Sequence, residues 1–589
     1  MKKNGAFLLV HALEQIGVRK TFGIPGVHNT EIYNQLGNSK VLEPILVTHE
    51  LSAGFMADAV SRTSDSIGAM VIVPGAGMTH SMSAIAEAAI DGIPMIVISG
   101  GIRREHGKSF PMHRLNMEKT LEDIIKKYYY LDSHCNIVQT IYDAYEVAVS
   151  EEPGPVFIEV PVETQLAEYD SDLLIPFKKK QKINPLQKQE GIGGGMQLFS
   201  AIESPEVKIE KAAALLLNSE SPGIYVGWGS VDAYEEVKQI AEMLSIPVAT
   251  TFQGVSAFPA NHPLHTGIGF GVSSTPAGEK AFDKCDCLLA VGLKFSELAT
   301  FNYHLEVPDN LIHIDINPDV FHKNYYAKVA IEGDSKLVLT EIIQKLKRNT
   351  IKPKNNFKDI TELIKREKEE YKKTWLVNSS EETVSPGFFF NALRNGFPED
   401  IIMVTDDGNH SLLALELFPV YMQRHFICPT DFNCLGYAIP AAIGAKMVNR
   451  QKTVIAIIGQ SALLMTGLEM FTAHNNKTGI IVFVFKEYEQ GKNQEHAEKK
   501  MVTTNSYGIL SIKGLADAVH AEYLSMKNDV EISGIISKAR EINKSGKSVL
   551  VEVNIDYSRK PKLALGMGKP KFSRFRLAEK LKMFFKGGN

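Results

Sequence analysis

The stretches VIAIIGQSALLMTG (residues 454–467) and IIVFVFKEYEQGKNQ (residues 480–494) decide the fold class of this chain. Each begins with an apolar run that is typical of a buried strand, over residues 454–458 and 480–485. Gly459 ends the first run, and a helical segment separates it from the second. A strand, a tight turn, a helix and a second strand form a βαβ unit, and such units bind ligands at the carboxyl ends of their strands.

Gln460 and Glu487 stand just beyond these two predicted strands, 27 residues apart in the sequence. Because parallel strands present their carboxyl ends at one edge of a sheet, we expect both side chains at the same rim. This rim is the first candidate for a functional site.

Composition limits the class of protein. The 589 residues, 44% of them hydrophobic, are enough for about three domains with separate cores. A net charge of −4 creates no overall positive field, so nucleic-acid binding is not expected. The five cysteines form neither a disulfide framework nor a zinc pattern, which fits a reducing compartment. The N-terminal apolar positions follow helical spacing, and no apolar run reaches the roughly 18 residues of a membrane span. We therefore expect a cytoplasmic protein.

Short apolar strands alternate with helices along most of the chain, which predicts an α/β fold of three doubly wound parallel-sheet domains. In the helix after residue 50, apolar positions 53, 56, 57 and 60 mark one face. The predicted strands are the start of TFGIPGVHN (residues 21–29) and residues 45–47, 69–73, 95–99, 156–160, 223–226, 247–249, 287–291, 311–316, 401–404, 454–458, 480–485 and 549–553.

The domain boundaries follow from where this alternation stops. A basic and then glycine-rich stretch predicts a linker, and a stretch dense in Lys and Glu at residues 357–373 predicts a solvated helical connection. The predicted segments are a first domain (1–175), the linker (176–205), a middle domain (206–345), the connection (346–383), a third domain (384–560) and a basic amphipathic tail (561–589).

Six stretches, taken in order, resemble the thiamine diphosphate (ThDP) enzymes, most closely the acetolactate synthase and 2-oxo-acid decarboxylase group. They are THELSAGFMADAVSR (48–62), PGAGMTHSMSAIAEAAIDGIPMIVISG (74–100), PGPVFIEVP (153–161), FPANHPLHTGIG (258–269), LIHIDINPD (311–319) and FNCLGYAIPAAIGAK (432–446). The resemblance implies a pyrimidine-binding, a middle and a diphosphate-binding domain. It also implies a homodimer or homotetramer, with the cofactor between the pyrimidine domain of one subunit and the diphosphate domain of another.

The resemblance implies that a 2-oxo acid adds to the cofactor and loses CO2, after which the product is protonated or joined to an acceptor carbonyl. Glu50, in the pattern Thr-His-Glu, would hydrogen-bond the aminopyrimidine, a role that an apolar setting supports. Without the resemblance, Glu50 is an acid in a first helical turn. His28 and His113 fall where relatives have a proton-relaying histidine and a glutamine that points into the site. A loop histidine is otherwise a surface residue.

The resemblance also assigns residues to cofactor binding. Leu435 matches the large apolar residue that is wedged beneath the cofactor, although by sequence alone it is a core residue. Gly408, Asn409 and His410 would contact the diphosphate, because a helix N-terminus is a natural anion site; N-capping by Asp407 or Asn409 is compatible with this. The predicted cofactor-binding residues are Gly75, Gly77, Thr79, Gly408, Asn409, His410, Leu435, Gly459 and Ser461.

The metal site departs from the family pattern. Relatives hold Mg2+ with the Asp of a Gly-Asp-Gly turn, the second Asn of a later pair, and one backbone carbonyl. This chain has Gln460 and Glu487 at the side-chain positions, with the carbonyl falling on Glu489. One amide and one carboxylate remain, which suits the oxygen preference of Mg2+. Lys486 adds an ammonium that could instead neutralise the diphosphate or fill an empty site. Three interpretations stay open: an exchanged ligand pair, or loss of the cofactor in a non-catalytic binding or regulatory subunit. The third is cofactor-free chemistry in the emptied cleft with His28, Glu50 and His113, for which the sequence gives no positive signal.

Two further features remain. Segments 227–229 and 292–295 align with the flavin-contacting loops of some relatives, but the arginine expected near Lys294 is absent, so FAD is not expected. In the tail, Leu577, Leu581, Phe584 and Phe585 line one face of a basic helix. Such a helix either docks on protein or makes peripheral contact with an anionic membrane surface.

Overall fold

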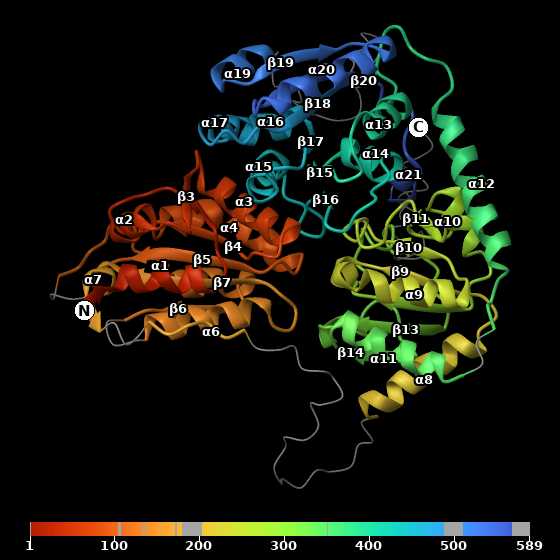
Figure 1. The fold of residues 1–589 in the computed structure, drawn as a ribbon, viewed down its shortest axis with the longest axis horizontal. Helices are drawn as coiled ribbons and strands as arrows, with labels where there is room; N and C mark the ends of the chain where they lie inside the picture. The colour runs from red at the N-terminus through yellow and green to blue at the C-terminus, as the bar shows by residue number, and fades with distance from the viewer. Residues whose placement is uncertain are drawn as a thin grey trace, which may run out of the picture. The chain divides into compact units, whose positions relative to one another are not determined.

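The structure is a computed structural model and describes residues 2–103, 108–132, 136–170, 174–179, 203–349, 352–487 and 510–567. Most of the predicted linker and the basic tail beyond residue 567 therefore lie outside the described residues. The chain divides into two compact units, one with the first and third sheets and one with the middle sheet, and Figure 1 labels most of their helices and strands. Among the described residues, no helix is long and apolar enough to cross a membrane.

The first sheet has six parallel strands in the order β3-β2-β4-β5-β7-β6. A separate antiparallel pair joins the two ends of the segment. The strands are β1 (Lys2–Asn4), β2 (Lys20–Gly23), β3 (Glu43–Leu46), β4 (Gly68–Ile72), β5 (Met95–Gly101), β6 (Lys127–Tyr130), β7 (Pro155–Pro161) and β8 (Glu168–Asp170), with β1 paired to β8. The helices are α1 (Gly5–Gln15), α2 (Thr30–Asn38), α3 (Glu50–Thr63), α4 (Ala76–Ile90), α5 (Met117–Leu121), η1 (Glu122–Ile124), α6 (Ile137–Val149) and α7 (Val162–Leu166).

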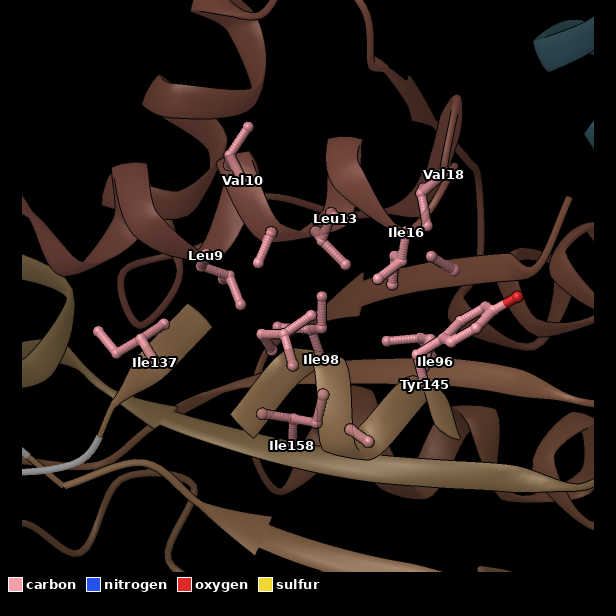
Figure 2. Close-up of a cluster of buried hydrophobic side chains, with 14 of the residues drawn as sticks. Leu9, Val10, Leu13, Ile16, Val18, Ile96, Ile98, Ile137, Tyr145 and Ile158 are labelled. Carbon is pink, nitrogen blue, oxygen red and sulfur yellow. The ribbon is translucent and has the colours of Figure 1, made fainter. Parts of the chain in front are cut away.

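Helix α1 packs on this sheet beside α6, and both bury aliphatic side chains against it. Figure 2 shows Leu9 and Leu13 of α1 above Ile98 of β5, with Ile158 of β7 below. Helices α3 and α4 pack against each other and against β4 and β5. The core thus fixes the strand ends from which the candidate site residues emerge.

The middle sheet also has six parallel strands, in the order β11-β10-β9-β12-β13-β14. Its elements are α8 (Pro205–Asn218), β9 (Pro222–Val226), η4 (Trp228–Ala233), α9 (Tyr234–Leu244), β10 (Val248–Thr250), β11 (His265–Ile268), α10 (Pro276–Ala281), β12 (Cys287–Val291), β13 (Asn310–Asp315), η5 (Pro318–Val320), β14 (Val329–Glu332), α11 (Ser335–Lys347) and α12 (Phe357–Trp375). The two segments that align with flavin-contacting loops touch each other, because the Gly229 N–H donates to the Gly292 carbonyl over 3.0 Å.

The third sheet runs β16-β15-β17-β18-β20-β19, again all parallel. Its elements are α13 (Pro386–Gly396), β15 (Ile402–Thr405), α14 (Asn409–Leu417), β16 (Phe426–Ile427), α15 (Ala438–Val448), β17 (Val454–Gly459), α16 (Gln460–Thr466), η6 (Gly467–Glu469), α17 (Met470–Asn475), β18 (Ile481–Glu487), α19 (Ile512–Ala518), β19 (Glu522–Met526), η7 (Asp529–Glu531), α20 (Ile532–Lys544) and β20 (Val549–Ile555); a last helix is α21 (Lys562–Met567). The predicted class of three doubly wound parallel sheets is confirmed.

Helix α3 of the first sheet packs against α15 of the third within one unit. A Cβ atom at Gly444 in α15 would lie 2.4 Å from the Met56 carbonyl oxygen, so only glycine permits this approach. All α3 residues except Leu51 are buried. The apolar spacing predicted only one buried face of α3 and so underestimated how much of the helix is buried. Helix α15 covers the side of α3 that the first sheet leaves open.

Candidate functional site

Glu50 is a buried carboxylate at the first turn of α3. His49 caps this helix, because its Nδ1 accepts the Leu51 N–H over 3.1 Å. His80 Nδ1 lies 3.1 Å from Glu50 Oε2. The other carboxylate oxygen faces Gly77, where a Cβ atom would lie only 3.3 Å from Oε1. The Glu50 carboxylate therefore lies between the His80 ring and the backbone of Gly77, which has no side chain.

The glycine turn at residues 75–77 begins α4. Gly75 has φ 58°, and a Cβ atom there would lie 2.6 Å from the His113 carbonyl oxygen. A side chain would therefore be both strained and obstructed at this position. The exposed Thr79 turns its hydroxyl onto the Ala76 carbonyl, at 3.0 Å. The turn thus borders Glu50 at Gly77 and the His113 segment at Gly75.

His28 and His113 lie side by side, with ring centroids 5.2 Å apart in an edge-on arrangement. The His28 carbonyl accepts from Gln165 Nε2 over 2.7 Å and closely approaches Gly100, so its backbone is fixed. Burial lowers the pKa of His28, and the nearby His113 and Arg103 lower it further. His28 Nδ1 is buried without a hydrogen-bond partner in the described part of the chain. A neutral imidazole with a free nitrogen can accept a proton from a bound molecule.

His49, Glu50 and His80 also bring three metal-ligating atoms within 4.8 Å of one another. The two imidazole rings, however, are stacked with centroids 4.9 Å apart and planes inclined by 28°. Stacked rings do not aim their nitrogens at one common point, and the His49 Nδ1 lone pair already accepts the Leu51 N–H. The arrangement is a hydrogen-bonded pair beside a cap rather than a metal centre.

A second group of candidate residues lies at the carboxyl end of β15. Gly408 has φ 139°, and the buried His410 ring packs across it, since a Cβ atom at residue 408 would lie 2.8 Å from ring Cε1. Gly459 borders the same ring, since a Cβ atom at residue 459 would lie 3.4 Å from Cε1. Burial lowers the pKa of His410 to about 4, opposed by its hydrogen bond to the Asp406 backbone. His410 Nε2 is buried and lacks a partner among the described residues. Such an orphaned atom is a candidate for contact with a bound molecule.

Asp406 is a functional candidate that sequence reasoning missed. Its buried carboxylate accepts the N–H groups of Gly436 over 2.9 Å and Ala438 over 2.8 Å. Burial raises the pKa of Asp406 to about 6, although these hydrogen bonds act in the opposite direction. Leu435, which is half-buried, immediately precedes Gly436. Asp406 thus joins the diphosphate-type turn to the loop that carries Leu435. Its only sequence signal is its place between a buried strand and Gly408.

The two altered metal positions lie at neighbouring strand ends. Gln460 and Ser461 are half-buried at the start of α16, directly after β17. In the β17–β18 register Gly459 pairs with Phe485, two residues before Glu487. The backbone therefore brings Gln460 and Glu487 to the same edge of the sheet. Glu489 lies outside the described residues.

The Lys486 ammonium has a protein partner. Its Nζ lies 3.3 Å from Glu552 Oε1, and Glu552 Oε2 accepts the Tyr523 hydroxyl over 2.6 Å. The charge of Lys486 is therefore matched within the sheet, by Glu552 on β20.

Comparisons with known proteins agree with this geometry. Three family models match the chain: the N-terminal TPP-binding domain of thiamine pyrophosphate enzymes at residues 3–125, their central domain at residues 209–342 and their C-terminal TPP-binding domain at residues 406–553. A probable acetolactate synthase large subunit of Methanocaldococcus jannaschii is 30% identical over 82% of this chain and 80% of its own length.

Two other relatives cover most of the chain. The acetolactate synthase isozyme 3 large subunit of Escherichia coli is 25% identical over 94% of this chain and 95% of its own length. Acetolactate synthase 1 of Zea mays, a chloroplastic protein, is 26% identical over 93% of this chain and 84% of its own length. With all three domains matched in order and its fold built from their three sheets, the chain belongs to the thiamine pyrophosphate enzymes, as an acetolactate synthase-like member.

Proposed function

We propose that this chain is a ThDP-dependent lyase or transferase that decarboxylates a 2-oxo acid and then protonates the product or joins it to a second carbonyl. The observation that carries the proposal is the buried Glu50 carboxylate, which lies between His80 and Gly77, a residue without a side chain. The acetolactate synthase relatives support the 2-oxo acid as substrate class. When bound, ThDP supplies a carbon nucleophile and an electron sink for decarboxylation.

Each group of site residues has a proposed task. Glu50 hydrogen-bonds the aminopyrimidine of the cofactor and controls its protonation, a task for a carboxyl group shielded from water. His28 exchanges a proton with the substrate, since its lowered pKa leaves it neutral at pH 7. His113 holds His28 from the neighbouring segment. His410, with its orphaned Nε2, and the turns at Gly408 and Gly459 receive the diphosphate.

Mg2+ would be held by the Gln460 amide and the Glu487 carboxylate, with Glu489 supplying a backbone carbonyl. The donor set supports this, because one carboxylate, neutral oxygens and phosphate oxygens suit a small hard cation. The pairing of Lys486 with Glu552 also supports it, since that ammonium already has a carboxylate partner.

A second copy of the chain completes the site in this proposal. Apolar side chains are exposed along α16, η6 and α17, directly after the Gln460 turn. They are Leu464, Met465, Leu468 and Phe471, which are 43%, 54%, 62% and 41% exposed. Exposed apolar groups on consecutive turns mark surfaces that another protein covers. A ThDP-free binding or regulatory subunit, the alternative reading, is not favoured by the complete set of three matched domains.

Calorimetric titration of the purified full chain with ThDP, with and without Mg2+, tests the proposal, followed by measurement of CO2 release from a panel of 2-oxo acids. We expect Mg2+-dependent binding and CO2 release from at least one 2-oxo acid. The Glu50→Gln variant should bind ThDP but lose activity by about 10²–10⁴-fold, the range of a general acid–base contribution. Absence of any binding at millimolar ThDP would refute the proposal.

A further inference from the structure

The loop at residues 428–437, between β16 and α15, has no helix or strand of its own. Backbone N–H groups that are buried in such a loop need other acceptors. Three buried carboxylates provide them: Glu87, Asp91 and Asp406. They accept the N–H groups of Thr430, Asp431, Cys434, Gly436 and Ala438.

Glu87 reaches this loop from a different domain. It lies in α4, beside the first sheet, and is 0% exposed. Its Oε2 accepts the Cys434 N–H over 2.9 Å, and its Oε1 accepts the Thr430 N–H over 3.3 Å. The two oxygens of the Glu87 carboxyl group thus bind two backbone N–H groups of the loop, on Thr430 and Cys434.

Leu435 is held on both sides by these carboxylates. The N–H group before it, on Cys434, binds Glu87, and the N–H group after it, on Gly436, binds Asp406. Gly436 is fixed further, because its carbonyl accepts the Thr466 hydroxyl over 2.9 Å. The backbone on either side of Leu435 therefore cannot shift without breaking a hydrogen bond to a buried carboxyl group.

Keeping Glu87 in this position is costly for the fold. Two other buried acids, Asp58 and Asp91, already pair with the buried Arg62, at 2.7 Å and 2.9 Å. Burial, and then the charge of Asp91, raise the pKa of Glu87 to about 9. A buried acid at the edge of such a cluster destabilises a domain unless it is hydrogen-bonded. The two backbone N–H groups of the loop are the compensating partners.

We propose that Glu87 is a positioning residue that fixes Leu435 beneath the cofactor and so makes the diphosphate-type domain depend on α4 of the pyrimidine-type domain. This inference rests on the proposed function, in which Leu435 wedges beneath ThDP. Glu87 itself touches neither substrate nor cofactor. It acts through the backbone on one side of Leu435.

The first test is independent of the cofactor. Amide hydrogen exchange of the full chain without ThDP is measured on peptides that cover residues 428–437, in the wild type, Glu87→Ala and Glu87→Gln. We expect at least tenfold faster exchange of this loop in Glu87→Ala. Glu87→Gln should show a smaller change, because its amide oxygen still accepts the Cys434 N–H. Asn449→Ala is the matched control: Asn449 Nδ2 donates to the Thr63 carbonyl over 3.2 Å, which joins the same two domains beyond the other end of α15. It should leave the loop unchanged.

The second test is a double-mutant cycle on ThDP affinity. Glu87→Ala should weaken the Kd for ThDP about tenfold in the wild-type background but less than twofold in Leu435→Ala, because residues that act through each other are not additive. Equal losses in both backgrounds, or unchanged exchange of the loop in Glu87→Ala, would overturn the inference. If the wild type bound no ThDP, the proposed function would fail, and the exchange experiment would still decide whether Glu87 holds the loop.

Discussion

Glu50 lies against Gly77 so closely that a side chain at residue 77 would crowd its carboxylate. A Cβ atom there would lie 3.3 Å from Glu50 Oε1 and 2.9 Å from Val73 Cγ2. We therefore predict that Gly77→Ala displaces the carboxylate and lowers kcat about tenfold or more, because misplaced catalytic groups lose much of their effect. Steady-state kinetics on the best 2-oxo acid measures this.

Gly37→Ala is the control for that variant. Gly37 lies within α2, and a Cβ atom there would meet nothing within 4 Å. Alanine is a better helix former than glycine by roughly 0.5–1 kcal/mol, so this substitution should keep full activity and stabilise the chain slightly. Wild-type kcat in Gly77→Ala would contradict the role given to the space beside Glu50.

The strands that the sequence pattern predicts and those that it does not predict lie in different places in the sheets. The runs at β12, β17 and β18 were predicted within two residues, because central parallel strands are buried on both faces and are almost wholly apolar. Seven strands were not predicted: β6, β11, β14, β16 and β19, which are edge strands of the six-stranded sheets, and β1 and β8, which form the separate pair. An edge strand is short or polar, as in β6 with the sequence KYYY, and gives little periodic signal.

His410 is predicted to take up a proton when ThDP binds. With its pKa near 4 the ring is neutral at pH 7, and its hydrogen bond to the Asp406 backbone accounts for the ring proton. Nε2 is then an acceptor, and it can donate to a diphosphate oxygen only after protonation. The heat of ThDP binding at pH 7, measured in buffers of different ionisation enthalpy, should show more proton uptake in the wild type than in His410→Gln. Identical uptake in the two proteins would exclude this contact.

The same residue makes stability depend on pH. Unfolded histidine has a pKa of about 6.5, and in the folded chain that of His410 is about 4. The folded state therefore binds fewer protons in this window, and stability falls as the pH is lowered through it, by up to roughly 3 kcal/mol. Thermal unfolding between pH 7.5 and 4.5 should show a smaller loss of Tm in His410→Gln than in the wild type. Parallel curves would contradict the buried neutral ring.

The exchanged ligand pair gives a prediction about Mg2+. Gln460 and Glu487 lie at the neighbouring ends of β17 and β18, so removal of either donor should weaken Mg2+ binding. We expect Gln460→Ala to raise the Mg2+ concentration for half-maximal ThDP binding about tenfold or more. Gln460→Asp combined with Glu487→Asn restores the usual ligand types and should bind at least as tightly as the wild type. Mg2+-independent binding in the wild type would refute the metal assignment. Lys486→Met serves as control, since that ammonium pairs with Glu552.

Parts of the candidate site could be predicted because they are local in sequence. Glycine turns such as Gly75–Gly77 have a recognisable pattern, and so has the stretch Gly408-Asn409-His410. Asp406 and Glu87 could not be found this way. Each accepts N–H groups from a segment that lies tens or hundreds of residues away, as Glu87 does from Cys434. No spacing rule marks a buried acid whose partners are backbone groups so far away in the sequence.

The exposed apolar face of α16, η6 and α17 predicts self-association. Leu468 is 62% exposed in η6, between Leu464 and Phe471 on neighbouring turns. If a second copy covers this face, Leu468→Glu places an unpaired charge in the interface, which costs several kcal/mol. Sedimentation velocity should then show a shift from dimer or tetramer to monomer, with loss of ThDP binding because the proposed site needs both copies. Val530→Glu, at a residue 76% exposed in η7, is the matched control and should leave the assembly unchanged. A monomeric wild type that binds ThDP with full affinity would refute both the interface and the shared site.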